Sequence, residues 1–394
     1  MVTATDLSAR VEEGLRTRNQ LFEEFFARES TRLAAACREM ADRFLRGGRL
    51  LAFGRGPCVT DAQHVAVEFV HPVIVGKRAL PALDISPMFR PWLEAILQPS
   101  DIAMGFGPPE GDPEVAAALR AAHLRGAMTF ALPGTSGSYA AARATADPFV
   151  HQELVEILYH TLWESVHVFF EHRELGHEVG QAGFLYPFLG QARQEPATLV
   201  ADVAASIRMK VQDDAVLRDQ VAREETDRIG DSVLAMHERL QRGGKLILFG
   251  NGGSATDAND WALDCIAPPA SFRPIPAVSL SLEPAVLSAV ANDVGTEVMF
   301  LRQLIAHARP DDVAIGISTS GGSRNIVATL AEARKRGLLT VALLGYDGGE
   351  IKRQGLADHS IVVRSDYIPR IQEVQASIYH LMRESLETLG RGQA

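Results

Sequence analysis

Three blocks of this sequence occur twice, in the same order. The matching pairs are residues 47–63 with 243–259 at a shift of 196, 99–107 with 310–318 at a shift of 211, and 152–165 with 372–385 at a shift of 220. Three ordered matches indicate a duplication, and the growing shift places insertions in the second copy. We therefore expect two copies of one domain, in residues 1–172 and 197–394, joined by a linker at 173–196.

Each copy alternates short apolar runs with helical patterns. A long helical stretch comes first (residues 6–45 and 197–241), and an apolar run, a glycine-rich turn and a further helix follow. The expected strands are 50–53, 79–85, 102–105 and 127–132 in the first copy and 246–249, 275–280, 313–317, 340–344 and 360–363 in the second. Helices are expected between them, for example at 113–124 and 326–336. This alternation predicts an α/β fold with a doubly wound parallel sheet in each copy, flanked by helices in three layers.

The composition excludes several classes of protein. The net charge of −10 argues against direct nucleic-acid binding, which needs a basic surface. No run of about 18 apolar residues is present, so we expect no membrane span. The first 20 residues lack the apolar segment of a secretion signal. Three cysteines without metal-binding spacing favour a reducing cytoplasm.

Two segments of the second copy have the features of an anion site. GNGGS, with Asn251, Gly252, Gly253 and Ser254, joins a strand to a helix; glycines let backbone N–H groups approach an anion, although a plain tight turn explains the segment equally well. ISTSGGSRN also follows a strand and precedes a helix, and its hydroxyls suit a phosphate monoester. These hydroxyls belong to Ser318, Thr319, Ser320 and Ser323. A serine-rich helix cap is the alternative.

These motifs carry a family resemblance. GNGGSATDA, AVANDVGTE, ISTSGGSRN, LLGYDGGE and RIQEVQASIYH resemble, in this order, the sugar isomerase (SIS) domain of bacterial phosphoheptose isomerases. The resemblance covers residues 206–389, and residues 11–168 are similar to the same domain more faintly. It implies a homotetramer with active sites between subunits, conversion of sedoheptulose 7-phosphate to a heptose 7-phosphate, and a zinc ion held by His, Glu, Gln and His.

Carried over to this sequence, the resemblance divides the functional residues between the copies. In the first copy His64, Glu68, Gln152 and His160 match the zinc ligands, and Glu68 and His160 match the acid/base pair. The phosphate loop of that copy is lost, because Gly107, Pro108, Pro109 and Asp112 replace its hydroxyls. Prolines donate no N–H group and an aspartate repels phosphate.

The second copy shows the opposite losses. Its serine loop is complete, and Gln372 and His380 match the family, with Gln372 expected to contact substrate. Asp260 and Asp264 replace the His and Glu, and with His380 they form a possible second site. Asp293, in AVANDVGTE, either caps a helix or contacts a substrate hydroxyl.

The complementary losses suggest a fused pseudo-dimer with composite sites. Phosphate would sit on the loop at 318–323, while His64, Glu68, Gln152 and His160 would act at the reacting end of a sugar phosphate. We expect a phosphosugar aldose–ketose isomerase that works through a metal-stabilised enediol, and a homodimer that forms a pseudo-tetramer of SIS domains.

Other interpretations remain open at this stage. His64 and Glu68 can be an ordinary helix pair, because residues four apart share one helix face. SIS domains also resemble sugar-phosphate sensors and a bacterial protein that binds the replication initiator, which would make this chain a non-catalytic regulator or scaffold. A third resemblance is to the tandem isomerase half of glucosamine-6-phosphate synthase. The remaining histidines of the first copy, at 151, 167, 172 and 177, are expected on the surface.

Overall fold

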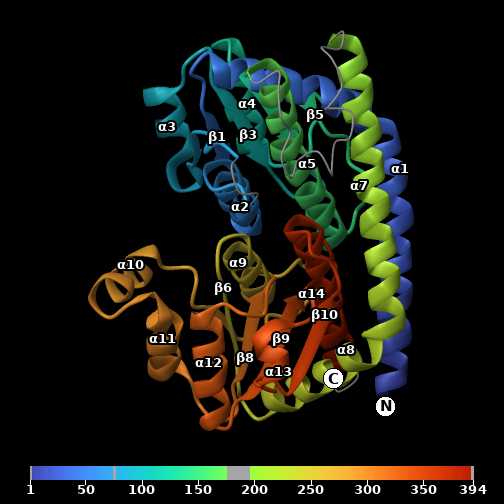
Figure 1. Cartoon of the computed structure of the whole chain (residues 1–394), viewed down its shortest axis with the longest axis vertical. Coiled ribbons are helices and arrows are strands. Elements are labelled where there is room, and N and C mark those ends of the chain that lie inside the picture. Colours follow the sequence, from blue (N-terminus) through green and yellow to red (C-terminus); the bar gives the residue numbers. More distant parts are fainter. Residues whose placement is uncertain (1, 74–76, 175–195, 392–394) are drawn as a thin grey trace. The chain divides into compact units, whose positions relative to one another are not determined.

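The structure, a computed structural model, describes residues 2–73, 77–174 and 196–391. It contains two five-stranded parallel sheets with the orders β2-β1-β3-β4-β5 and β7-β6-β8-β9-β10 (Figure 1). The two orders are the same when the strands are matched along the chain. Helices cover both faces of each sheet, so the expected α/β fold with two doubly wound sheets is confirmed.

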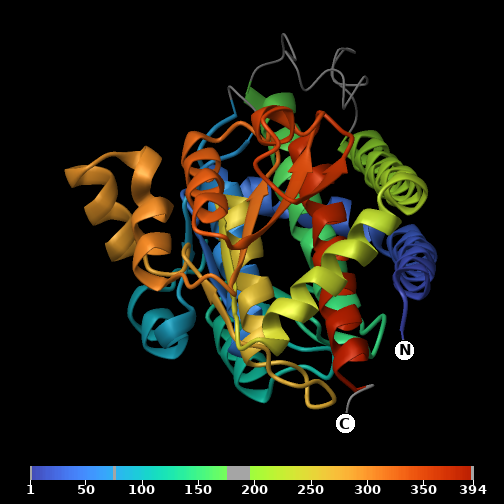
Figure 2. The same ribbon diagram turned by 90° about the horizontal axis from the view of Figure 1, so that it is seen from below.

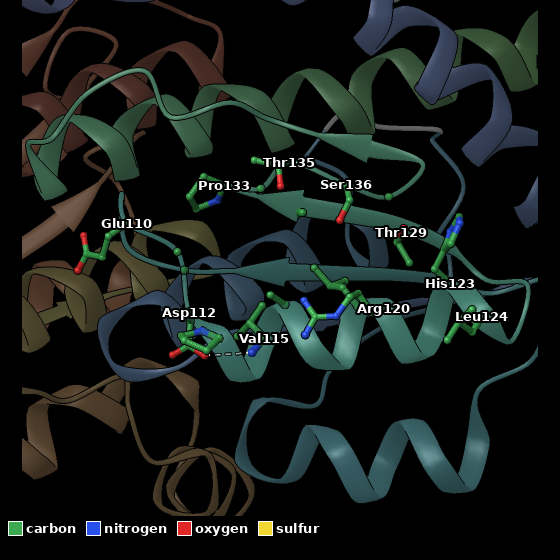
Figure 3. Close-up of a pocket in the computed structure, with 18 residues that line it drawn as sticks. Glu110, Asp112, Val115, Arg120, His123, Leu124, Thr129, Pro133, Thr135 and Ser136 are labelled. Atoms are coloured by element: carbon green, nitrogen blue, oxygen red, sulfur yellow. Dashed lines mark hydrogen bonds between the residues drawn. The ribbon is translucent and has the colours of Figure 1, made fainter.

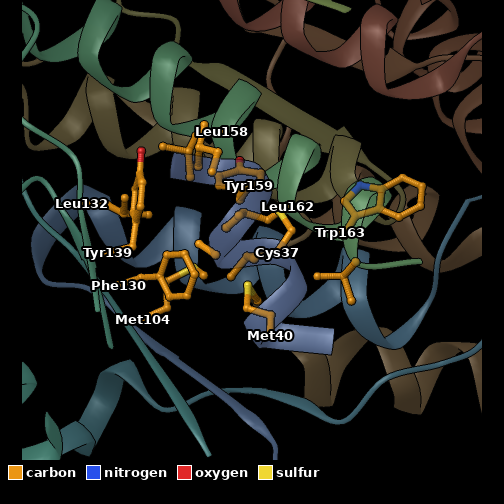
Figure 4. Packing of buried hydrophobic residues seen from close by; sticks show 14 of the residues in the cluster. Cys37, Met40, Met104, Phe130, Leu132, Tyr139, Leu158, Tyr159, Leu162 and Trp163 are labelled. Carbon is orange, nitrogen blue, oxygen red and sulfur yellow. The ribbon is translucent and has the colours of Figure 1, made fainter. Parts of the chain in front are cut away.

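The first sheet separates two apolar cores. Its strands are β1 (Leu50–Phe53), β2 (Ala82–Asp84), β3 (Ile102–Phe106), β4 (Met128–Leu132) and β5 (Tyr139–Ala140). Because successive side chains of a strand point to opposite faces, Leu50 and Ala52 face one core and Leu51 and Phe53 face the other. The first core contains side chains of α1 (Ala4–Leu45), α2 (Val59–Val70) and α5 (Pro148–Glu174), and Figure 4 shows part of it around Cys37 and Trp163. The second core contains α3 (Phe89–Ile96) and α4 (Pro113–Leu124).

The second sheet repeats this arrangement. Its strands are β6 (Leu246–Gly250), β7 (Ala277–Ser279), β8 (Val313–Ser318), β9 (Leu339–Gly345) and β10 (His359–Val363). One core lies under α8 (Thr226–Gln241), α9 (Gly253–Ile266) and α14 (Ile368–Arg391). The other lies under α11 (Met299–His307), α12 (Arg324–Lys335) and α13 (Gly349–Arg353). In Figures 1 and 2 the orange helix α12 and the red helix α14 lie on opposite sides of these strands.

The compact units do not follow the expected boundaries at 172 and 197. One unit, called here the first unit, comprises residues 20–213, and the second unit comprises 1–19 with 214–394. The physical reason is that each of two long helices contributes side chains to a core in both units. In α1, Leu7 and Val11 are buried in the second unit, whereas Phe22 belongs to the first. In α7 (Pro196–Glu224), Val203 and Val221 divide in the same way. Of the expected linker at 173–196, residues 175–195 lie outside the described residues.

Several elements differ from the sequence-based expectation. The helix expected at 197–241 is two helices, α7 and α8, because the chain leaves helical geometry at the buried Glu225. The strand expected at 79–85 is shortened to β2. The insertions of the second copy are visible as α10 (Pro284–Asp293), between β7 and β8, and as α13, between β9 and β10. Within the described residues, every helix is too short or too polar to cross a membrane.

Candidate functional site

The first unit brings His64, Glu68 and His160 together. His64 and Glu68 lie one turn apart on α2, and His160 lies on α5. The Nε2 atoms of His64 and His160 are 3.3 Å apart, and His64 Nε2 is 3.8 Å from Glu68 Oε1. All three residues are at least 98 % buried. The apolar residues around them on α2 and α5 fix this geometry, because they pack the two helices on the same face of the sheet.

This donor set suits a divalent metal. One ligand atom from each of the three side chains lies within 4.8 Å of the other two. Zinc binds imidazole nitrogen at about 2.0–2.1 Å in tetrahedral geometry, which puts two such nitrogens about 3.3 Å apart. The observed separation of the two imidazole nitrogens therefore fits a shared ion.

Gln152 lies at the neighbouring turn instead. Its Nε2 donates a hydrogen bond to Thr60 Oγ1 over 3.2 Å. Thr60 precedes His64 by one turn of α2, about 6 Å along the helix. The structure thus brings three of the four expected ligands together and places the fourth beside Thr60.

The second unit contains a matching cluster with different chemistry. Asp260 and Asp264 lie on α9 and His380 on α14, and all three are buried. His380 Nε2 is 3.2 Å from Asp264 Oδ2 and 3.5 Å from Asp260 Oδ2. The hydroxyl of Tyr379 donates to Asp260 Oδ2 over 2.8 Å.

One of the two buried carboxylates has a raised pKa. Burial, followed by the charge of Asp260, raises the pKa of Asp264 to about 7, against the opposing effect of His380. The Asp260–Asp264–His380 cluster is also compact enough to hold a cation. Gln372, on the same helix as His380, is 98 % buried. Its Oε1 makes no hydrogen bond to any of the described residues.

The serine loop of the second unit lies between β8 and α12. Ser318 is the last residue of β8, and its Oγ accepts from Gly321 N and lies 3.4 Å from Ser323 Oγ. Ser323 occupies the N-cap of α12 but makes no side-chain cap bond. Ile326 N donates to Asn325 Oδ1, which leaves the N–H groups of Arg324 and Asn325 for an anion, together with the partial positive charge of the helix start. Thr319 is half-buried and Ser320 is exposed.

The glycine turn at 250–254 is tied to this loop. Asn251 Nδ2 donates to Asn325 Oδ1 over 3.0 Å, and Asn325 Nδ2 donates to Asn251 Oδ1 over 2.8 Å. Gly252 has a φ of +57° at the start of α9, a conformation that glycine adopts without strain. Gly253 and Ser254 form the buried first turn of that helix. Parallel strands β6 and β8 are neighbours, so both loops lie at the same carboxyl edge of the sheet.

The corresponding helix start of the first unit already holds a carboxylate. Asp112 caps α4, and its Oδ1 accepts from Glu114 N and Val115 N. The same carboxylate pairs with Arg55 over 3.2 Å. A helix start that already holds its own carboxylate repels a second anion.

Two sequence-based expectations change at this point, those for His151 and His167, while the substrate contact of Asp293 stays a prediction. Asp293 is the exposed last residue of α10, where its Oδ1 accepts from Asn292; no hydrogen bond among the described residues joins it to the serine loop. His151 and His167 are buried, so the expectation that they lie on the surface is wrong. They face backbone carbonyls, His151 that of Gly107 and His167 those of Trp163 and Arg78. His177 and the side chain of His172 lie outside the described residues.

Sequence reasoning missed two polar partners. Tyr379 binds Asp260, and Thr60 binds Gln152. The sequence contained a hint of both contacts, because Tyr379 is next to His380 and Thr60 lies one helical turn before His64. Its partner is on another helix, however, and a contact of that kind is not encoded in local spacing.

The sequence is similar to proteins that carry a SIS domain. A profile described as the SIS domain matches residues 212–345. A phosphoheptose isomerase of Trichlorobacter lovleyi is 37% identical over 182 residues, which are 46% of this chain and 92% of that protein. Another, from a Nitratiruptor species, is 45% identical over 146 residues, 37% of this chain and 77% of that protein.

Two solved structures share the fold over nearly the whole chain. A putative tagatose-6-phosphate ketose/aldose isomerase from Clostridium novyi has a TM-score of 0.61 at 11% identity and covers 96% of this chain and 88% of its own. The C-terminal domain of glucosamine-fructose-6-phosphate aminotransferase from Francisella tularensis has a TM-score of 0.62 at 8% identity, with 94% of each chain covered. At such identities the likeness concerns the fold alone.

Proposed function

This chain belongs to the SIS-domain family that includes the phosphoheptose isomerases, and on that premise we propose that it is a phosphosugar aldose–ketose isomerase. The observation that carries the proposal is the buried His64–Glu68–His160 cluster, with its two imidazole nitrogens 3.3 Å apart. Aldose–ketose isomerisation moves a proton between adjacent carbons, so it needs a group that accepts a proton and returns it.

We assign phosphate binding to the loop at 318–323. Its hydroxyls and the uncapped start of α12 suit a phosphate monoester, and the turn that carries Asn251 supports it. Gln372 is a substrate contact in this proposal, because its buried Oε1 can accept a hydrogen bond from a sugar hydroxyl.

We assign proton transfer to His160 and Glu68. An imidazole changes charge near neutral pH, which suits a group that both takes and returns a proton. His64, Glu68 and His160 would also hold a divalent ion, zinc being the one that this donor set favours, and such an ion supplies polarisation of the substrate carbonyl. Metal binding would compete with proton transfer at both residues, because a carboxylate that binds a metal becomes less basic and an imidazole nitrogen that binds one has no lone pair left for a proton. His160 is the base that we test first.

Sedoheptulose 7-phosphate is the first substrate to test, in view of the named relatives. We expect turnover by the metal-loaded full chain and at least a 100-fold loss of kcat in His160→Asn. Ser320→Ala with Ser323→Ala should raise KM by about 10-fold or more with a smaller effect on kcat. A His160→Asn variant with unchanged kcat would overturn the assignment of the base.

The matched control is the cluster of the second unit. His380→Asn is the counterpart of His160→Asn, and Asp264→Asn removes the carboxylate at the position that matches Glu68. If these two variants lose turnover while His160→Asn keeps it, the chemistry belongs to the second unit. We expect the reverse, because Glu68 and the His64–His160 pair match the donor types of the family.

A regulatory function is the second candidate, and one observation favours it. The unit that keeps the open serine loop has aspartates in place of the His and Glu of the family. A sensor would bind sugar phosphates with an affinity that depends on Ser320, and would interconvert none of a panel of ketose and aldose phosphates.

A further inference from the structure

The first unit has a cavity of about 610 Å³ beside α4, within the usual size range of small-molecule sites. It runs along α4 from Asp112 to Leu124 and is bounded on the other side by β4 and the loop at 133–137. Figure 3 shows Arg120 midway along it, with Glu110 and Asp112 at one end and His123, Leu124 and Thr129 at the other. All of its lining residues belong to the first unit.

The cavity exists because an element of the second unit has no counterpart in the first. In the second unit, α13 follows β9, and its Ile351 is fully buried in the same core as Ile326 and Leu330 of α12. In the first unit the chain crosses from β4 to β5 in residues 133–138 without a helix. No helix lies between β4 and β5, so the loop at 133–137 bounds the cavity on the side away from α4.

The loop at 133–138 is held away from α4. Gly137 has a φ of +127°, and a Cβ at this residue would lie 2.7 Å from Thr129 Oγ1. Thr129 N donates to Ser138 Oγ and Ser138 N donates to Thr129 Oγ1, both over 3.1 Å. These contacts fasten the loop to β4, so the cavity is a feature of the folded chain rather than of a loose segment.

The lining determines what the cavity can bind. Val115, Ala116, Leu119 and Ala131 make its walls apolar. Among the described residues, Arg120 makes no hydrogen bond or ion pair, although it is a permanent cation on an apolar wall. Thr135 and Ser136 add hydroxyl groups on the loop across from α4.

Charge decides which way an acidic ligand points. Asp112 lies eight residues before Arg120, about 12 Å along the helix. At the other end Arg55 pairs with Asp112, and the Glu110 carboxylate there repels an anion. The guanidinium of Arg120 attracts one and binds both carboxylate and phosphate in a bidentate manner.

We propose that this cavity is a binding site for a small organic anion, a phosphate ester or a carboxylate with an apolar body, whose acidic group binds Arg120. Its body lies against Val115, Leu119 and Ala131. The site is independent of the serine loop and of the proposed isomerase activity.

Calorimetric titration of the full chain tests the proposal, with phenyl phosphate and phenylacetate as probes and phenol as the uncharged control. The background is Ser320→Ala with Ser323→Ala, so that phosphate binding at the serine loop does not contribute. We expect both acids to bind, and phenol to bind at least 10-fold more weakly. The more tightly bound acid identifies phosphate or carboxylate as the preferred group.

Three variants place the binding in the cavity. Arg120→Ala should weaken phenyl phosphate binding at least 10-fold, Arg120→Lys less, and Ala116→Trp should abolish it by filling the space. Arg302→Ala removes the same charge from an exposed position on α11 and should change nothing. Arg120→Ala in the otherwise unchanged chain should keep its isomerase activity. Binding of either acid that survives both Arg120→Ala and Ala116→Trp, or no binding at all, overturns the proposal.

Discussion

The side chains of Asn251 and Asn325 exchange two hydrogen bonds, each amide nitrogen donating to the other's carbonyl oxygen over 3.0 and 2.8 Å. This pair joins the turn after β6 to the first turn of α12. In the first unit an ion pair, Arg55 with Asp112, joins the corresponding segments. The same connection is thus neutral where phosphate is proposed to bind and charged where the helix start already holds a carboxylate.

Asn251→Ala should weaken substrate binding more than it weakens the fold. The substitution leaves Nδ2 of the 92 % buried Asn325 without its acceptor, although Oδ1 still accepts from Ile326 N, and an unsatisfied buried donor costs about 1–3 kcal/mol of unfolding free energy. Because the serine loop loses its support, KM should rise by about 5- to 10-fold. Urea denaturation and steady-state kinetics measure the two effects. Ser288→Ala, which removes a bond from an exposed hydroxyl on α10, is the control, and an unchanged KM would contradict the supporting role of Asn251.

Asp112→Ala should act on stability alone. It removes the cap of α4 and the partner of Arg55, for a loss of about 1–2 kcal/mol. The affinity for a sugar phosphate should stay the same, since the first unit's loop holds no phosphate in our proposal. Ser323→Ala, at the matching N-cap of α12, should give the opposite result, with a small change in stability and a clear loss of affinity. Equal effects of the two variants on affinity would argue against this assignment.

Metal removal should affect the two buried clusters differently. If His64, Glu68 and His160 hold the ion, chelation should lower both the melting temperature and the activity, and added zinc should restore them. Glu68→Gln should reduce the bound metal measured by elemental analysis, whereas Asp264→Asn should leave most of it in place. A metal content that follows Asp264 and not Glu68 would move the site to the second unit.

His167 should make the fold sensitive to acid. Burial lowers its pKa from 6.5, although both ring nitrogens face backbone carbonyls. As the pH falls below about 6.5, the unfolded chain takes up a proton that the folded chain resists, so the unfolding free energy decreases. His167→Gln should flatten this decrease between pH 6.5 and 5 in urea denaturation of metal-free protein. An identical pH profile for the variant would show that His167 does not contribute.

The three cysteines should differ in reactivity. Burial raises the pKa of Cys37 and of Cys265 to about 12, so both stay as thiols at neutral pH. Cys58 is only half-buried, just before α2. Native protein treated with iodoacetamide should be labelled at Cys58 first, as peptide mass spectrometry can show, and all three should react in urea. Labelling of Cys37 at the same rate as Cys58 would mean that the core around α1 opens readily.

The sequence predicted what depends on residue type and local spacing. The repeated blocks and the alternation of apolar runs with helical patterns were enough for two parallel sheets, and seven of the strands begin and end within one residue of their expected limits. The helix at 113–124 agrees with α4 in both limits. The sequence analysis did not predict the helices α3, α10, α11 and α13, because the periodic pattern of apolar residues is weak in short segments.

The sequence alone predicted that His64 lies beside Glu68 and that the loop at 318–323 is rich in hydroxyls, because each feature is contained in a few consecutive residues. Only the tertiary structure decided that His160 meets His64 while Gln152 meets Thr60, that α1 and α7 are each shared between two cores, and that a cavity lies beside α4. These outcomes depend on how helices from distant parts of the chain pack against one sheet. Packing of that kind is set by the summed shape and burial of many side chains, which no single segment contains.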